Sequence, residues 1–181
     1  MSSYADFLAS KQPTRKLFGF EPLWIPAWLF DFQADLTRWN VRQGRSATFA
    51  DCGLGKTPMQ LVWAENIVRK FSKPVLILTP LAVAAQMVRE AEKFGIEVHR
   101  TKQGTVHKGI NITNYQRLGY YNPKDFVAVS ADEGSILKNF DGKTRKAVTD
   151  SWPRWNSGAS PRPRPPPTTS WSWARRPRPW A

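Results

Sequence analysis

The chain has 181 residues, of which 41% are hydrophobic, and a formal net charge of +13. This length supports one domain with a real core and is too short for two large ones. The single cysteine excludes an internal disulfide framework. Neither a signal-peptide core nor the run of about 18 apolar residues that a membrane span needs is visible. We therefore expect one cytoplasmic globular unit with no membrane partner.

The composition changes near Asp150. From Ser151 onward the chain holds eight of its 15 prolines, five of its nine tryptophans, six arginines and no acidic residue. Residues 1–150 remain basic without this segment, which permits a nucleic-acid partner. We expect an N-terminal extension over 1–22, a folded unit over 23–150 and a disordered tail over 151–181, because the tail composition cannot form a packed core.

The predicted elements alternate between helix and strand. A helix is expected over 28–44, where Leu29, Phe32, Leu36 and Trp39 recur at helical spacing and should face the core. A short β-prone run, a glycine loop and a second helix follow, with Pro58 tolerated in the first turn of that helix. Continuous apolar runs at 74–79 and 126–131 are typical of buried parallel strands. A helix over 82–94 and strands over 96–100 and 110–114 lie between them, so the order predicts a doubly wound α/β sheet.

The strongest chemical signal is the stretch ADCGLGKT, from Ala50 to Thr57. Backbone N–H groups of Gly53 to Lys56 would surround a terminal phosphate at a helix N-terminus, where a side chain in place of glycine would block the approach. Lys56 would reach the β- and γ-phosphates of a nucleotide, and the hydroxyl of Thr57 would bind Mg²⁺. The alternative is a glycine turn with no nucleotide-binding role that precedes Lys-Thr by chance.

A phosphate loop of this kind needs a second, acidic site, and the sequence FVAVSADEGS supplies one. Asp132 follows an apolar strand and is placed to hold Mg²⁺, while Glu133 is placed to orient or deprotonate the attacking water. Two adjacent acids are also common on solvated surfaces. Their position directly after a buried strand favours the functional interpretation.

These motifs together resemble the N-terminal ATPase lobe of superfamily-2 helicases of the Swi/Snf-like kind common in bacteriophages, which has a RecA-like P-loop fold. ADCGLGKT is similar to the A-x-T-G-x-G-K-T of that superfamily, DEGS is similar to its DExx box, and SILKNFDGKTRKA resembles the segment that follows the box. LTPLAVAAQMVRE and ITNYQRL resemble two motifs that contact a nucleic-acid strand. The resemblance covers about 30–150.

The resemblance implies a set of roles. Gln33 occupies the position of the glutamine that reads adenine, and Thr79, Pro80 and Asn114 occupy positions that contact nucleic acid. Catalysis is assigned to Lys56, Asp132 and Glu133, and Mg²⁺ to Thr57 and Asp132. The residues assigned to ATP are Gln33, Ala50, Asp51, Cys52, Gly53, Leu54, Gly55, Lys56 and Thr57. The expected partner is nucleic acid, DNA in preference to RNA, in a bacterial or phage-infected cytoplasm, with no stable protein partner.

Each role has a structural alternative. Gln33 may be read as a solvated helix residue, Thr79 as the N-cap of the next helix, and Asn114 with Tyr115 as a turn packed on the core. Cys52 is expected to be a small loop residue and not a nucleophile. Core or cap packing, in place of base stacking, is expected for four tryptophans, Trp24, Trp28, Trp39 and Trp63.

The tail conceals a helicase-like motif in another frame. With suitable synonymous codons for PRPRPPPTTSWSWA, residues 161–174, the frame that begins on the last base of each codon reads TATPAPNDFMELG, which resembles the motif that follows the DExx box in phage members. Each tryptophan fixes TGG, and those bases fall in the codons for Met, Glu, Leu and Gly. The tail is therefore interpreted as an out-of-frame product. The alternatives are a polyproline-II ligand for an SH3 or WW domain and a basic arm for nucleic acid.

The expected function is the ATP-binding lobe of a nucleic-acid-dependent ATPase that translocates on or remodels nucleic acid, with ATP and Mg²⁺ as cofactors. Superfamily-2 enzymes hydrolyse ATP between two lobes, and the second lobe supplies an arginine finger. Because 181 residues leave no room for that lobe, this chain should bind nucleotide weakly and turn it over little. Two alternatives remain, another P-loop phosphotransferase and a non-catalytic interaction protein that binds through its tail.

Overall fold

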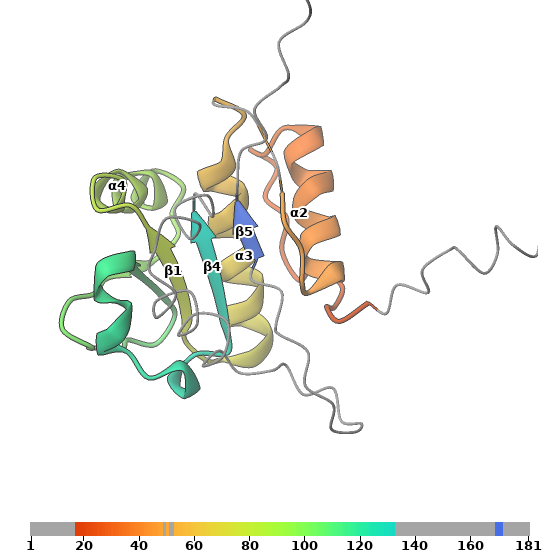
Figure 1. Ribbon diagram of the computed structural model, residues 1–181. Coiled ribbons are helices and arrows are strands. Elements are labelled where there is room, and N and C mark those ends of the chain that lie inside the picture. Colours follow the sequence, from red (N-terminus) through yellow and green to blue (C-terminus); the bar gives the residue numbers. More distant parts are fainter. Residues whose placement is uncertain (1–16, 49, 51–52, 133–168, 172–181) are drawn as a thin grey trace, which may run out of the picture.

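The computed structural model describes residues 17–48, 50, 53–132 and 169–171. Its helices are α2 (Asp31–Gln43), α3 (Lys56–Phe71) and α4 (Ala84–Lys93), with two 3-10 helices, η1 (Tyr115–Tyr120) and η2 (Pro123–Asp125). The strands are β1 (Val75–Thr79), β2 (Val98–Arg100), β3 (Ile110–Asn114), β4 (Ala128–Asp132) and β5 (Thr169–Trp171). Figure 1 shows α2 and α3 side by side next to the sheet.

The five strands form one sheet in the order β2-β3-β1-β4-β5, and every pairing in it is parallel. The central strand β1 is buried along its whole length, as its unbroken apolar run predicts. In register, Thr79 lies beside Asn114 of β3, and Leu78 lies beside Ala131 of β4. The carboxyl ends of β1, β3 and β4 therefore meet at one edge of the sheet, and the predicted α/β fold is confirmed.

Side chains of β1 alternate between two apolar clusters, as the pleat of a strand requires. Val75 and Ile77 pack with the three α-helices, around the buried side chains of Leu61 and Trp63. On the opposite face, Leu76 and Leu78 belong to a second cluster, whose other buried members are Tyr115, Leu118, Tyr121, Phe126, Val129 and Ala131. The described part of the chain thus covers both faces of the sheet, with α-helices on one and η1 on the other.

The buried face of α2 differs from the prediction. Phe32 is 44% exposed, and Leu36 and Trp39 are only partly buried, whereas the buried residues are Gln33, Ala34, Thr37, Asn40, Val41 and Gln43. Most of these side chains are small or polar, and the amides of Gln33 and Asn40 are hydrogen-bonded. Asn40 accepts from Ser46, and it both donates to and accepts from Thr48. The buried hydroxyl of Thr37 has no partner among the described residues. The apolar stripe instead lines an open pocket of about 770 Å³ with Asp35, Ala47 and Thr48.

The run before the glycine loop was expected to be a strand, and the described residues 44–48 and 50 contain none. Side-chain hydrogen bonds attach this run to α2: Ser46 donates to the Asn40 amide oxygen, and Thr48 both donates to and accepts from the Asn40 amide. A strand requires a hydrogen-bonded neighbour, and none of the recorded strand pairings among the described residues includes this run.

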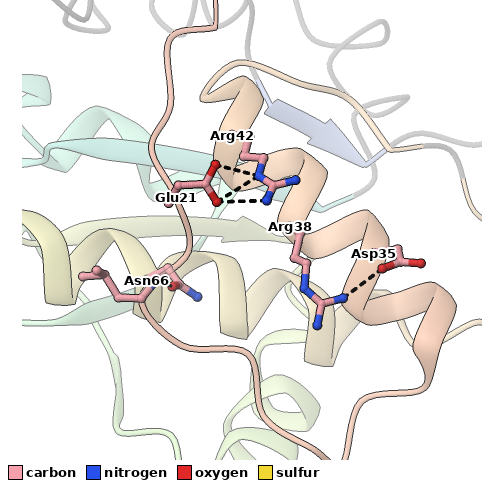
Figure 2. Close-up of polar contacts among 6 residues, drawn as sticks. Glu21, Asp35, Arg38, Arg42 and Asn66 are labelled. Atoms are coloured by element: carbon pink, nitrogen blue, oxygen red, sulfur yellow. Dashed lines mark hydrogen bonds and ion pairs between the residues drawn. The ribbon is translucent and has the colours of Figure 1, made fainter.

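The described part of the N-terminal extension packs on α2. Backbone N–H groups of Phe18, Gly19 and Phe20 donate to carbonyls of Gln43, Arg42 and Val41. Gly19 is required by this close approach, because a Cβ at that position would lie 1.7 Å from the carbonyl oxygen of Val41. The carboxylate of Glu21 also binds Arg42, as Figure 2 shows. Residues 17–22 thus lie against the folded unit.

The predicted tail contributes one short strand, β5, which pairs with β4. Residues 151–168 and 172–181 lie outside the described residues. The expected packing role of the tryptophans holds for Trp63 in the core and for Trp28, which stacks on Phe94 with ring centroids 4.3 Å apart. Arg69 lies 4.5 Å from the ring centroid of Trp24.

Candidate nucleotide-binding site

The glycine loop leads directly into α3, as predicted. Gly53 and Gly55 have φ values of +82° and +69°, in the left-handed region that glycine adopts without strain. Lys56 is the first residue of α3, Thr57 the second and Pro58 the third, so proline lies in the first turn. No side chain of a described residue caps this end of the helix. The first N–H groups of a 16-residue helix are therefore left to bind an anion.

Gln33 lies against the glycine loop. Its side chain is 5% exposed, its Nε2 donates to the carbonyl of Leu54 at 3.1 Å, and its Oε1 accepts from the backbone N–H of Phe30 at 3.1 Å. A Cβ at Gly55 would come within 2.2 Å of the Gln33 amide nitrogen. The structure therefore brings the predicted adenine-reading residue and the predicted phosphate loop together, and excludes the alternative of a solvated glutamine.

Lys56 folds back over the loop. Its Nζ donates to the carbonyl of Ala50 at 3.3 Å, so the ammonium group is held beside the loop that was predicted to surround phosphate. Thr57 is partly buried next to it. Among the described residues, the loop thus gathers backbone N–H groups, one ammonium and one hydroxyl, which are the donor types that a nucleotide phosphate with its Mg²⁺ requires.

The predicted acidic residue Asp132 ends strand β4 at the same sheet edge. It is 9% exposed, and its backbone carbonyl accepts a hydrogen bond from the hydroxyl of Tyr115. A contact that the sequence did not suggest fixes β4 relative to α3: Gln60 Nε2 donates to Ser130 Oγ at 2.6 Å, and both side chains are buried. Gln60 follows Lys56 by one helical turn, so this bond connects the loop helix to the acidic strand.

One feature of the sequence could have pointed to Gln60, because it is a polar residue within the apolar run MQLVW. A buried polar side chain needs a partner, but the sequence did not identify Ser130, which is 70 residues away. Three predicted site residues, Asp51, Cys52 and Glu133, lie outside the described residues. Within the described ranges, no three His, Cys, Asp or Glu side chains cluster to hold a metal ion.

The predicted nucleic-acid residues lie at the same edge of the sheet. Thr79 and Asn114 are register partners on β1 and β3, and both are buried. Asn114 accepts from the backbone N–H of Arg117 and caps η1. Thr79 does not cap the next helix, because α4 begins at Ala84 after its N-cap Val83. Among the described residues the Thr79 hydroxyl has no hydrogen-bond partner, and the carbonyl of Pro80 accepts from Val83 and Ala84.

Comparisons with known proteins define the class of fold. The chain has a RecA-like α/β fold, similar to that of a solved SWI2/SNF2 ATPase core and of a solved helicase. No protein-family model matches the sequence, and no curated protein matches it. Each helix in the described residues is too short or too polar to span a membrane.

Two solved structures are similar to this chain. The SWI2/SNF2 ATPase core of Sulfolobus solfataricus, solved in complex with double-stranded DNA, superimposes with a TM-score of 0.60 at 22% identity over 87% of this chain. The UvsW helicase of bacteriophage T4 gives a TM-score of 0.58 at 14% identity over 79% of this chain. The matched regions span 34% and 53% of those two chains. At these identities the likeness establishes the fold.

Proposed function

We propose that this chain is the ATP-binding lobe of a nucleic-acid-dependent ATPase that moves along or remodels nucleic acid. The observation that carries the proposal is the contact of Gln33 with the carbonyl of Leu54, because it joins the residue expected to read adenine to the loop expected to bind phosphate. A glycine turn without a nucleotide role has no need of that buried amide. The similarity in fold to helicase ATPase cores supports the same conclusion.

The residues present fit MgATP. Gln33 would bind the adenine, the N–H groups from Gly53 to Lys56 and the Lys56 ammonium would hold the phosphates, and Thr57 would hold Mg²⁺, with Asp132 beside it. When bound, the nucleotide would supply the phosphoryl group, and Mg²⁺ would neutralise the negative charge of its phosphates. Glu133 is proposed to orient the attacking water. The Gln60–Ser130 hydrogen bond keeps the two halves of this site in register.

The first test is nucleotide binding to the full chain, measured with a fluorescent ATP analogue in Mg²⁺. We expect Lys56→Ala to weaken binding at least about tenfold, which corresponds to about 1.4 kcal/mol, a modest part of a charge-assisted phosphate contact. Lys73→Ala is the matched control, since this exposed lysine lies just beyond the other end of α3. Equal binding by Lys56→Ala and the unmodified chain would refute the assignment.

We further propose that hydrolysis by this chain alone is slow, because the arginine finger of such enzymes comes from a second lobe. The matched regions of the two similar structures make up about a third and about half of their chains. ATP turnover that rises strongly with DNA and disappears in Lys56→Ala would contradict this part of the proposal while supporting the site.

We also propose that the chain is read out of frame from about Ser151. The hidden TATPAPNDFMELG sequence supports this interpretation, and neither a proline-rich ligand nor a basic arm accounts for it. Sequencing the coding DNA from codon 140 through the stop and several hundred bases beyond tests it directly. An adjacent frame that continues through ATPAPND into a second lobe is the expected result; a confirmed frame with nothing helicase-like downstream would make the tail genuine.

A further inference from the structure

A second feature of the molecule lies in the part of the sequence from β2 through η2. Residues 98–124, called the basic stretch below, contain five lysines and arginines and no acidic residue. The five cations are Arg100, Lys102, Lys108, Arg117 and Lys124. None of them forms an ion pair with any residue that the structure describes. Their charge is therefore left to act on solvent and on an anionic partner.

Two contacts bring the ends of the basic stretch together. The hydroxyl of Tyr121 donates to Thr101 Oγ1 at 2.8 Å, and both side chains are buried. The turn that follows Thr101 has φ values of +57° at Gln103 and +79° at Gly104, and Thr105 N–H donates to the carbonyl of Lys102. A Cβ at Gly104 would meet the carbonyl oxygen of Tyr120 at 2.5 Å. The Lys102 turn is thus packed directly against the end of η1.

Helix η1 has one buried and one outward face. Its inner side is formed by Tyr115 and Leu118, and Tyr121 directly after it is also buried. In a 3-10 helix, side chains three residues apart are eclipsed, so Arg117 and Tyr120 lie on one face. Tyr120 is 67% exposed, and its ring contacts no other ring among the described residues.

The exposed ring of Tyr120, with Arg117 on the same face of η1 and the Lys102 turn packed against its end, has the groups that bind single-stranded nucleic acid. A single-stranded nucleic acid exposes base faces that stack on aromatic side chains, while lysine and arginine contact its phosphates. A duplex keeps its bases stacked internally and offers no such face. The tyrosine accepts any base, since each base has a π-face, so this arrangement favours binding without sequence preference.

We propose that the surface formed by Lys102, Arg117 and Tyr120 binds a single strand of nucleic acid, with one base stacked on Tyr120 and phosphates held by the two cations. The proposal deepens the function above and rests on it for the identity of the partner. Asn114 caps the start of η1 and Tyr120 ends it, so this surface would continue along η1 the nucleic-acid contact that the resemblance implies for Asn114.

The test uses the full chain and a labelled oligothymidine, with binding followed by fluorescence anisotropy at several salt concentrations. We expect Tyr120→Ala to weaken binding at least about fivefold, because stacking of one base on an aromatic ring contributes at least about 1 kcal/mol. Tyr120→Phe keeps the ring and should bind within about twofold of the unmodified chain. Arg117→Gln should reduce the salt dependence, log Kobs against log[salt], by about 0.7 per lost phosphate contact.

A second readout separates stacking from general attraction to the arginines of the tail. An oligonucleotide that contains 2-aminopurine loses fluorescence when that base stacks on an aromatic ring. Quenching that is retained in Tyr120→Phe and lost in Tyr120→Ala supports the proposal. Lys73→Gln is the charge control, because Lys73 precedes β1 and lies outside the basic stretch.

Three results would overturn the proposal: unchanged affinity and quenching in Tyr120→Ala, equal losses in Tyr120→Phe and Tyr120→Ala, or binding of a blunt duplex that depends on Tyr120 as strongly as binding of the single strand. Nucleotide binding measured on the same variants keeps the two proposals apart. Tyr120→Ala should bind the ATP analogue normally, whereas Lys56→Ala should lose the analogue, so failure of one leaves the other standing.

Discussion

Three arginines of the region from the N-terminal segment through α3, residues 17–71, are bound by carboxylates, whereas no lysine or arginine of the basic stretch has such a partner among the described residues. In the first region Arg38 binds Asp35, Arg42 binds Glu21 and Arg69 binds Glu65, at N–O distances of 2.8 to 2.9 Å. Figure 2 shows the first two pairs on α2. In the basic stretch no cation has an acidic partner among the described residues.

Charged side chains that hold the fold together can thus be told apart from charged side chains that are available to bind a partner. A guanidinium that is already bound by a carboxylate contributes little net field and holds two parts of the same chain, as Arg42 does with the segment that carries Glu21. A cation without a carboxylate keeps its attraction for phosphate. Overall charge, +13 for the chain, does not distinguish these cases, and only the pairing pattern locates the surface for an anionic partner.

In both regions a buried asparagine side chain holds a loop through several hydrogen bonds to its backbone. Removing either amide has the largest expected effect on the free energy of unfolding. Asn66 accepts from the N–H groups of Leu23 and Trp24 and donates to two carbonyls. Asn111 accepts from His107 N–H and donates to the carbonyls of His107 and Gly109. Because each change leaves partly buried backbone groups without their hydrogen-bond partner, Asn66→Ala and Asn111→Ala should each lower the free energy of unfolding by about 3 kcal/mol.

Urea unfolding followed by circular dichroism measures both variants. The matched control is Asn122→Ala, which removes an exposed amide that accepts only from the N–H of Lys124 and should cost less than about 1 kcal/mol. A loss in Asn111→Ala no larger than in this control would show that the basic stretch is loosely held, and would break the likeness between the two regions.

The sequence identified the fold for a physical reason. Buried parallel strands read as unbroken apolar runs, so β1 and β4 were located to within two residues, and a glycine loop before a helix has a recognisable spacing. The face of α2 was predicted wrongly, because the apolar stripe of Phe32, Leu36 and Trp39 was assigned to the core while Asn40 and Gln33 are buried with their amides satisfied.

Features that depend on distant partners were not predictable from one sequence. The contact of Gln33 with Leu54 joins residues 21 apart, and the contact of Gln60 with Ser130 joins residues 70 apart. The exposure of Tyr120 follows from a 3-10 helix that no periodicity indicated. Glu133, Asp51 and Cys52 stay predictions, since they lie outside the described residues.

The smallest expected effect separates the two kinds of cation most directly. Arg42→Gln breaks an exposed ion pair and should lower the free energy of unfolding by at most about 1 kcal/mol, because solvent screens both groups. It should leave the salt dependence of oligothymidine binding unchanged. Lys102→Gln should behave in the reverse way, with unchanged stability and a slope of log Kobs against log[salt] that is smaller by about 0.7.

These two variants remove the same charge, so net charge cannot explain a difference between them. If both reduce the salt dependence equally, nucleic acid responds to the overall charge of the chain, and the pairing pattern has no bearing on where it binds. If only Lys102→Gln reduces it, the attraction is local to the basic stretch. The carboxylate of Glu21 is then what removes Arg42 from the nucleic-acid surface, and Glu21→Gln should restore to Arg42 the salt-dependent attraction that its partner now cancels.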